Sequence, residues 1–88
     1  MPLKAQKYLK LVGATIEREG RNSVEVSVTL NTIPVRSARI WFPIAHFFNN
    51  GADDLYAAAW VIDSRNTMLK KAGDPEGIQV DHAAGFMA

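Results

Sequence analysis

The sequence has no cysteine, which excludes a disulfide-linked scaffold and a zinc site made of thiolates. It has no apolar run near the roughly 18 residues that a membrane-spanning helix needs, because the longest, residues 55–62, has only eight. The N-terminus lacks the apolar stretch of a signal peptide, so we expect a cytoplasmic protein with no membrane partner. The net charge is only +1 and 48% of the residues are apolar, which excludes a disordered chain.

What is present is the composition of a small globular protein. A chain of 88 residues normally folds as one domain, here residues 1–88. The apolar surface that so short a chain buries barely offsets the entropy of ordering it, so a homodimer or a partner could add burial. Lys and Arg are in excess in residues 1–44, and Asp and Glu in residues 45–88. This asymmetry could present one face to an anionic partner.

The clearest local pattern lies in residues 23–31, where apolar and polar side chains alternate. Such alternation of β-branched and polar residues is typical of a half-buried antiparallel strand. A turn containing Gly and Asn precedes it, so we predict a β-hairpin over residues 8–31. A third strand is predicted over residues 35–43, with Arg39 and Trp41 on the face opposite to its apolar side chains.

One long helix is predicted over residues 53–72. Asp53 is suited to the N-cap, and Gly73 follows two lysines at the expected C-terminal end. Asn66 is the one polar interruption of the apolar stripe on this helix. The alternative is a strand over residues 56–62 followed by a short helix, although the run of three alanines favours the long helix.

The C-terminal tail, residues 74–88, contains one further strand candidate at residues 77–80. Its end has little to hold it unless Phe86 and Met87 dock on the rest of the molecule. Together these elements predict an α+β fold, in which a three- or four-stranded antiparallel meander packs against one long helix.

Five features follow one another over residues 9–72. They are a charged pair before a turn, a Val-rich strand, a Trp-apolar-Pro strand, a later Trp and a Leu-Lys-Lys helix end. This layout resembles that of many short proteins of phages and plasmids, most of which have no assigned activity. The chain departs from it after the Pro, where those proteins usually carry Lys, Ser and a polar residue. Here Ile44, Ala45 and His46 occupy these positions. The resemblance implies a mobile-element origin. The matching residues are Arg18, Glu19, residues 24–28, Trp41, Phe42, Pro43, Trp60, Leu69, Lys70 and Lys71.

The sequence offers little for catalysis. The two histidines, His46 and His82, lack the paired spacing of a metal site. No serine lies in a Gly-x-Ser-x-Gly elbow, and there is no Gly-rich phosphate loop. We therefore predict that the protein is not an enzyme and has no catalytic, metal-binding or cofactor-binding residues.

Trp, Tyr and Arg dominate the energetics of many protein contacts. We predict two candidate partner-binding surfaces, one on the outer face of the sheet and one on the helix. The first consists of Arg36, Arg39 and Trp41, and the second of Tyr56, Trp60 and Asp63.

The leading hypothesis is a small non-enzymatic binding protein that inhibits or adapts a host complex. By analogy, small anti-defence proteins such as inhibitors of CRISPR effectors act in this way. The partner would be a host protein or a protein–nucleic-acid complex, and the protein could also form a homodimer. One alternative is a module that binds single-stranded nucleic acid through a basic and aromatic sheet face. Arg39 and Trp41 would share that face, Arg36 and Lys10 would lie near it, and Lys4 and Lys7 would extend the basic stripe. Another is a structural, self-assembling adaptor.

Overall fold

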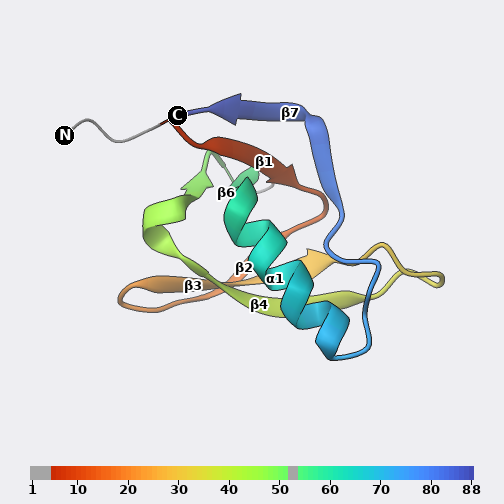
Figure 1. Ribbon diagram of the computed structural model, residues 1–88. Helices are drawn as coiled ribbons and strands as arrows, with labels where there is room; N and C mark the ends of the chain where they lie inside the picture. The colour runs from red at the N-terminus through yellow and green to blue at the C-terminus, as the bar shows by residue number, and fades with distance from the viewer. Residues whose placement is uncertain (1–4, 52–53) are drawn as a thin grey trace.

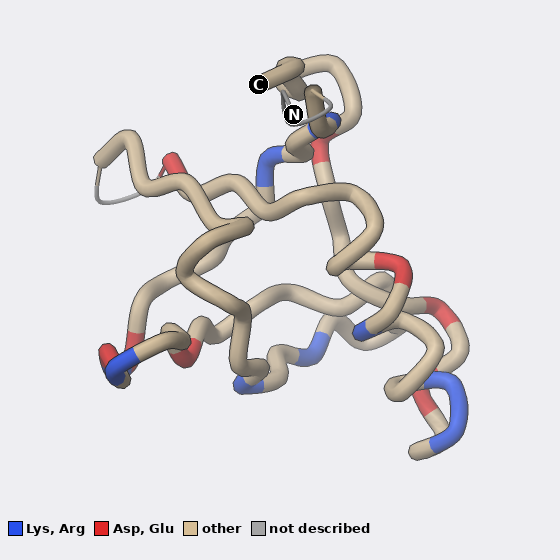
Figure 2. The backbone as a smooth tube through the Cα atoms, turned by 60° about the vertical axis from the view of Figure 1, so that its left-hand side comes forward, with Lys and Arg blue, Asp and Glu red and all other residues tan. Residues whose placement is uncertain are grey.

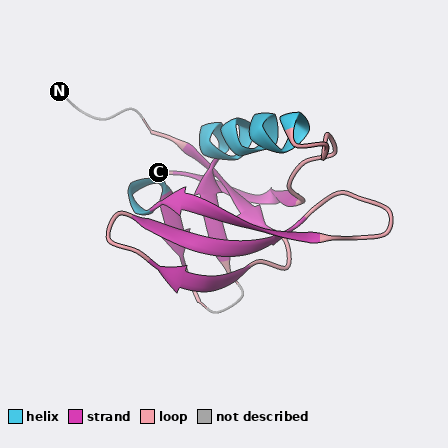
Figure 3. Ribbon diagram, turned by 90° about the horizontal axis from the view of Figure 1, so that it is seen from below, coloured by secondary structure: helices cyan, strands magenta, loops and turns pink. Residues whose placement is uncertain are grey.

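The computed structural model describes residues 5–51 and 54–88 and confirms the α+β class (Figure 1). The described strands form two antiparallel sheets, one of four strands in the order β5-β6-β1-β7 and one of three in the order β2-β3-β4. The α-helix α1 lies over one side of the strands (Figure 3). The elements are β1 (Lys7–Leu11), β2 (Thr15–Glu19), β3 (Ser23–Thr29), β4 (Ser37–Pro43), the 3-10 helix η1 (Ile44–His46), β5 (Phe47–Asn49), β6 (Leu55–Ala58), α1 (Ala59–Lys71) and β7 (Val80–Met87).

The three-stranded sheet follows the alternation in the sequence. β2 and β3 form a hairpin in which Gly20 N donates to Ser23 O over 2.7 Å, and β4 pairs with the other side of β3. The apolar side chains of β3 are buried because they face one core shared by both sheets and α1. Those side chains are Val24, Val26 and Val28, with Leu30 directly after the strand.

The second sheet was not predicted. Residues 8–11 do not extend the hairpin but belong to β1, which pairs with β6 and β7. The chain turns at Gly13, whose φ of 61° suits a residue without a side chain. This turn lets Leu9 and Leu11 enter the core from one sheet while β2 continues into the other.

The prediction of a helix over residues 53–72 was wrong at its N-terminal end. The helix begins at Ala59, and residues 55–58 form β6 between β5 and β1. Asp53, expected as the N-cap, lies outside the described residues. The alternative strand over residues 56–62 was correct in kind but too long. The C-terminal end is where it was expected, with Gly73 at a φ of 100° after the two lysines.

The tail is held by strand pairing. β7 pairs with β1, and the ring of Phe86 stacks on Tyr8 with centroids 5.2 Å apart. Met87 does not dock and is 62% exposed. The candidate strand at residues 77–80 contributes only an isolated bridge from Ile78 to Leu30 and the first residue of β7.

Candidate functional site

Arg39 and Trp41 lie on the exposed face of β4, as the alternation predicts. Trp41 is 41% exposed, and the guanidinium carbon of Arg18 lies 5.5 Å from the centre of its ring. Arg18 Nε donates to Glu25 Oε1 over 3.0 Å, and this hydrogen bond and the charge of Glu25 raise the pKa of Arg18. Glu25 lies directly opposite Trp41 and is only 7% exposed. Neither Arg18 nor Glu25 was part of the predicted surface, although Glu25 has the same strand parity as the half-buried polar residues of β3.

Arg36 does not join Arg39 and Trp41. It precedes β4, and its guanidinium forms an ion pair with Asp74, beyond the C-terminal end of α1. The inward-facing residues of β4 have even numbers, so Arg36 continues their alternation and not that of Arg39 and Trp41. The predicted three-residue surface is therefore corrected to a pair, Arg39 and Trp41.

The predicted helix surface does not form either. Tyr56 lies on β6, because the helix begins three residues later, and its ring contacts Phe86 with centroids 5.0 Å apart. Trp60 lies in the first turn of α1 and donates from Nε1 to Gln6 Oε1 over 3.0 Å. Asp63 is exposed farther along α1. The structure thus separates these three side chains onto two elements.

Tyr56 belongs to a polar cluster around the Asp54 carboxylate. A hydrogen bond from Asn50 Nδ2 over 2.8 Å, and then one from the Tyr56 hydroxyl, lower the pKa of Asp54. Lys10 Nζ, 3.5 Å from Asp54 Oδ1, acts in the same direction. The hydrogen bond to Asp54 raises the pKa of Tyr56, as do burial and the charges of Asp54 and Asp81.

We expect the Asp54 carboxylate to stabilise the fold at neutral pH and to lose that effect in acid. A depressed folded-state pKa gives stability that is present above the usual aspartate value of 3.8 and is lost as the pH falls through the folded-state pKa. Urea denaturation at pH 7 should therefore show Asp54→Asn less stable than the wild type, and the difference should vanish near the acid end of the titration. A difference that is constant with pH would contradict this assignment.

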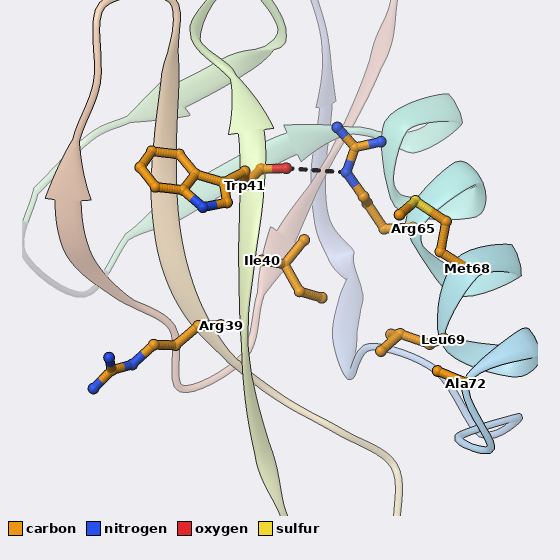
Figure 4. Close-up of a pocket in the computed structure, with 7 residues that line it drawn as sticks. All are labelled: Arg39, Ile40, Trp41, Arg65, Met68, Leu69 and Ala72. Carbon is orange, nitrogen blue, oxygen red and sulfur yellow. Dashed lines mark hydrogen bonds between the residues drawn. The ribbon is translucent and has the colours of Figure 1, made fainter.

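A groove runs between β4 and α1 and has a volume of about 490 Å³. Ile40 points from β4 toward the helix, and apolar side chains of α1 face it across the groove (Figure 4). Arg39 and Trp41 form the outer lip, where their side chains point away from the helix (Figure 4). The lining residues are Arg39, Ile40, Trp41, Arg65, Met68, Leu69 and Ala72. Arg65 and Met68 were not predicted as site residues, because their spacing along the helix does not indicate that a strand lies beside them.

The edge of β4 that borders this groove carries backbone groups directed away from β3. Leu30 N donates to Arg36 O, which makes these two residues a hydrogen-bonded pair of the antiparallel ladder. Pairs alternate along the ladder, so Arg39 and Trp41 direct their N–H and C=O groups outward. Trp41 O accepts from Arg65 Nε over 3.0 Å. The pairing with β3 leaves the outward N–H groups of Arg39 and Trp41 unused, and no backbone hydrogen bond outside the strands and helices of residues 5–51 and 54–88 involves them.

Other kinds of site find no support in the described part of the chain. There, no group of three His, Asp or Glu side chains is placed to hold a metal ion. No helix among the described residues has the length and apolar character needed to cross a bilayer. Comparison with known proteins identifies no matching family model, no matching characterised protein and no matching solved structure.

Proposed function

We propose that this chain is a non-enzymatic protein-binding domain, which takes an extended segment of a partner protein onto the edge of β4. The observation that carries this proposal is the row of outward N–H and C=O groups on β4 beside an apolar groove. An extended peptide can add a strand to such an edge, because main-chain hydrogen bonds give affinity and alternate side chains enter the adjacent groove. One acceptor of this edge is already occupied within the chain, because Arg65 donates a hydrogen bond to Trp41 O.

The distribution of charge favours a protein over a nucleic acid. Arg18 is neutralised by Glu25 and Lys10 by Asp54, so two of the basic residues near the sheets carry a carboxylate beside them. Figure 2 shows positively and negatively charged positions close together at several places along the described backbone. Binding of single strands depends on a continuous basic track for the phosphates. Inhibition of a host defence complex stays a prediction from the resemblance, and an inhibitor that acts by contact would use this groove.

Two methionines of equal exposure provide a matched test. Met68 lines the groove and is 61% exposed, whereas Met87 lies on β7 and is 62% exposed. We expect Met68→Glu to weaken peptide binding about tenfold or more, because it places a charge in the apolar groove, and Met87→Glu to leave binding unchanged. Peptides are first selected on the wild-type protein from a random twelve-residue library, and the affinities of synthetic copies are then measured by fluorescence polarisation.

The same selection can overturn the proposal. If no peptide is enriched on the wild-type protein, or if both methionine variants bind the selected peptides equally well, the groove is not a peptide site. Binding of a 20-nucleotide single strand that disappears at high salt would favour the nucleic-acid alternative instead.

A further inference from the structure

The added strand that the proposed function requires would present alternate side chains to two different environments. Side chains on the Ile40 side of the edge would enter the groove and meet Met68, Leu69 and Ala72, which are apolar (Figure 4). Side chains on the other side would lie beside Arg39, on the exposed face of the sheet. In antiparallel and parallel pairs alike, successive residues of the incoming strand alternate between these two faces.

The charges around the groove are positive. Arg39 lies at the lip, and Arg65 lies at one end with its Nε on Trp41 O, which leaves its two terminal nitrogens for other acceptors. Lys71 is one turn beyond Met68 on α1, so their side chains are neighbours on the helix surface. In the part of the chain that the structure describes, none of these three cations is in an ion pair with a carboxylate.

We propose that the partner segment is acidic, with apolar side chains entering the groove and Asp or Glu side chains alternating with them beside Arg39. This inference rests on the proposed function and specifies its partner. Opposite charges on directly neighbouring strands attract, and carboxylates also suit the planar guanidinium groups of Arg39 and Arg65. A basic segment would meet these like charges instead, and it would be rejected.

Three defined peptides test the inference. Each alternates valine with one polar residue over ten positions, and the polar residue is glutamate, glutamine or lysine. By fluorescence polarisation we expect the glutamate peptide to bind about tenfold more tightly than the glutamine peptide, and the lysine peptide to bind most weakly. Equal binding of all three, or preference for lysine, would overturn the acidic preference while leaving strand addition intact. Absence of binding by all three would overturn the proposed function as well.

A charge-reversal variant tests whether Arg39 is the source of the preference for acidic peptides. Arg39→Glu should reduce the affinity for the glutamate peptide and increase that for the lysine peptide, so that the preference inverts. Lys7→Glu makes the same change of charge sign on β1, in the other sheet, and should leave the preference as it is in the wild type. If both variants shift the preference equally, the selectivity comes from net charge and not from the groove, and the inference is wrong.

Discussion

Replacing both Arg39 and Trp41 with alanine is expected to abolish peptide binding and to leave the fold intact. Trp and Arg are the residues that most often dominate an interface, and loss of two of them should weaken binding about a hundredfold or more. Both side chains lie on the exposed face of β4, and Trp41 is 41% exposed. We expect the free energy of unfolding to fall by at most about 1 kcal/mol, a shift of roughly 4–8 °C in Tm.

The next residue on the same strand is the control. Phe42 points to the opposite face and is 0% exposed, so Phe42→Ala should cost about 3–5 kcal/mol through lost burial and the cavity it leaves. That is a large share of the about 5–15 kcal/mol that stabilises a typical domain. Calorimetry and peptide titration of the two variants separate the roles. A loss of stability in the Arg39 and Trp41 variant comparable to that of Phe42→Ala would mean that Trp41 is core, and the lip of the groove would lose its assigned role.

The parts of the fold that follow a local pattern were predictable from the sequence. β3 and β4 are long enough for the period of two to be unambiguous, and burial of one face fixes which side chains turn inward. The same parity placed Arg39 and Trp41 together. The helix end was predictable because Gly73 follows two lysines, a chemistry that stops a helix irrespective of what it packs on.

The second sheet could not be predicted, because its strands are short and their partners are distant in sequence. Residues 55–58 include two alanines, whose intrinsic preference is for helix. Pairing with β1 on one side and β5 on the other outweighs that preference, since Leu55, Ala57 and Ala58 are buried there. β5 has only three residues, which is too short for an alternating pattern to predict a strand.

The groove was not predictable for the same reason. Its two walls are β4 and α1, and neither shows in its own sequence that the other lies beside it. The open edge of β4 depends on the strand order, because a fourth strand next to β4 would have covered it. Sequence reasoning therefore found the lip, Arg39 and Trp41, but neither Arg65 nor Met68.

Asn66 is the polar residue that interrupts the apolar stripe of the helix, and we expect it to stabilise the fold through a hydrogen bond. Its Oδ1 accepts a hydrogen bond from Ile78 N over 2.9 Å, and Ile78 is only 3% exposed. The segment around Ile78 also bonds to the end of β3, because Gln79 N donates to Thr29 O over 2.8 Å. Asn66 thus ties α1, one wall of the groove, to the three-stranded sheet.

Removing this hydrogen bond should destabilise the protein even where the substituted residue has a higher helix propensity. Asn66→Ala improves helix propensity but leaves the buried N–H of Ile78 without an acceptor, at a cost of about 1–3 kcal/mol. Gly77→Ala should act through the same contact, because a Cβ on Gly77 would lie 2.9 Å from Asn66 Oδ1. Urea denaturation of each variant measures the cost.

A second glycine isolates that contact from backbone strain. Gly73 and Gly77 both have positive φ, 100° and 77°, but a Cβ on Gly73 would meet nothing within 4 Å. Gly73→Ala should therefore cost only the left-handed conformation, about 1–2 kcal/mol, and Gly77→Ala should cost clearly more. In the double variant of Asn66 and Gly77 the cost should be smaller than the sum of the two single costs, because either change alone already breaks the bond to Ile78 and only the backbone strain at Gly77 is added. Additive costs, or equal costs at the two glycines, would show that Asn66 does not hold the tail to the helix.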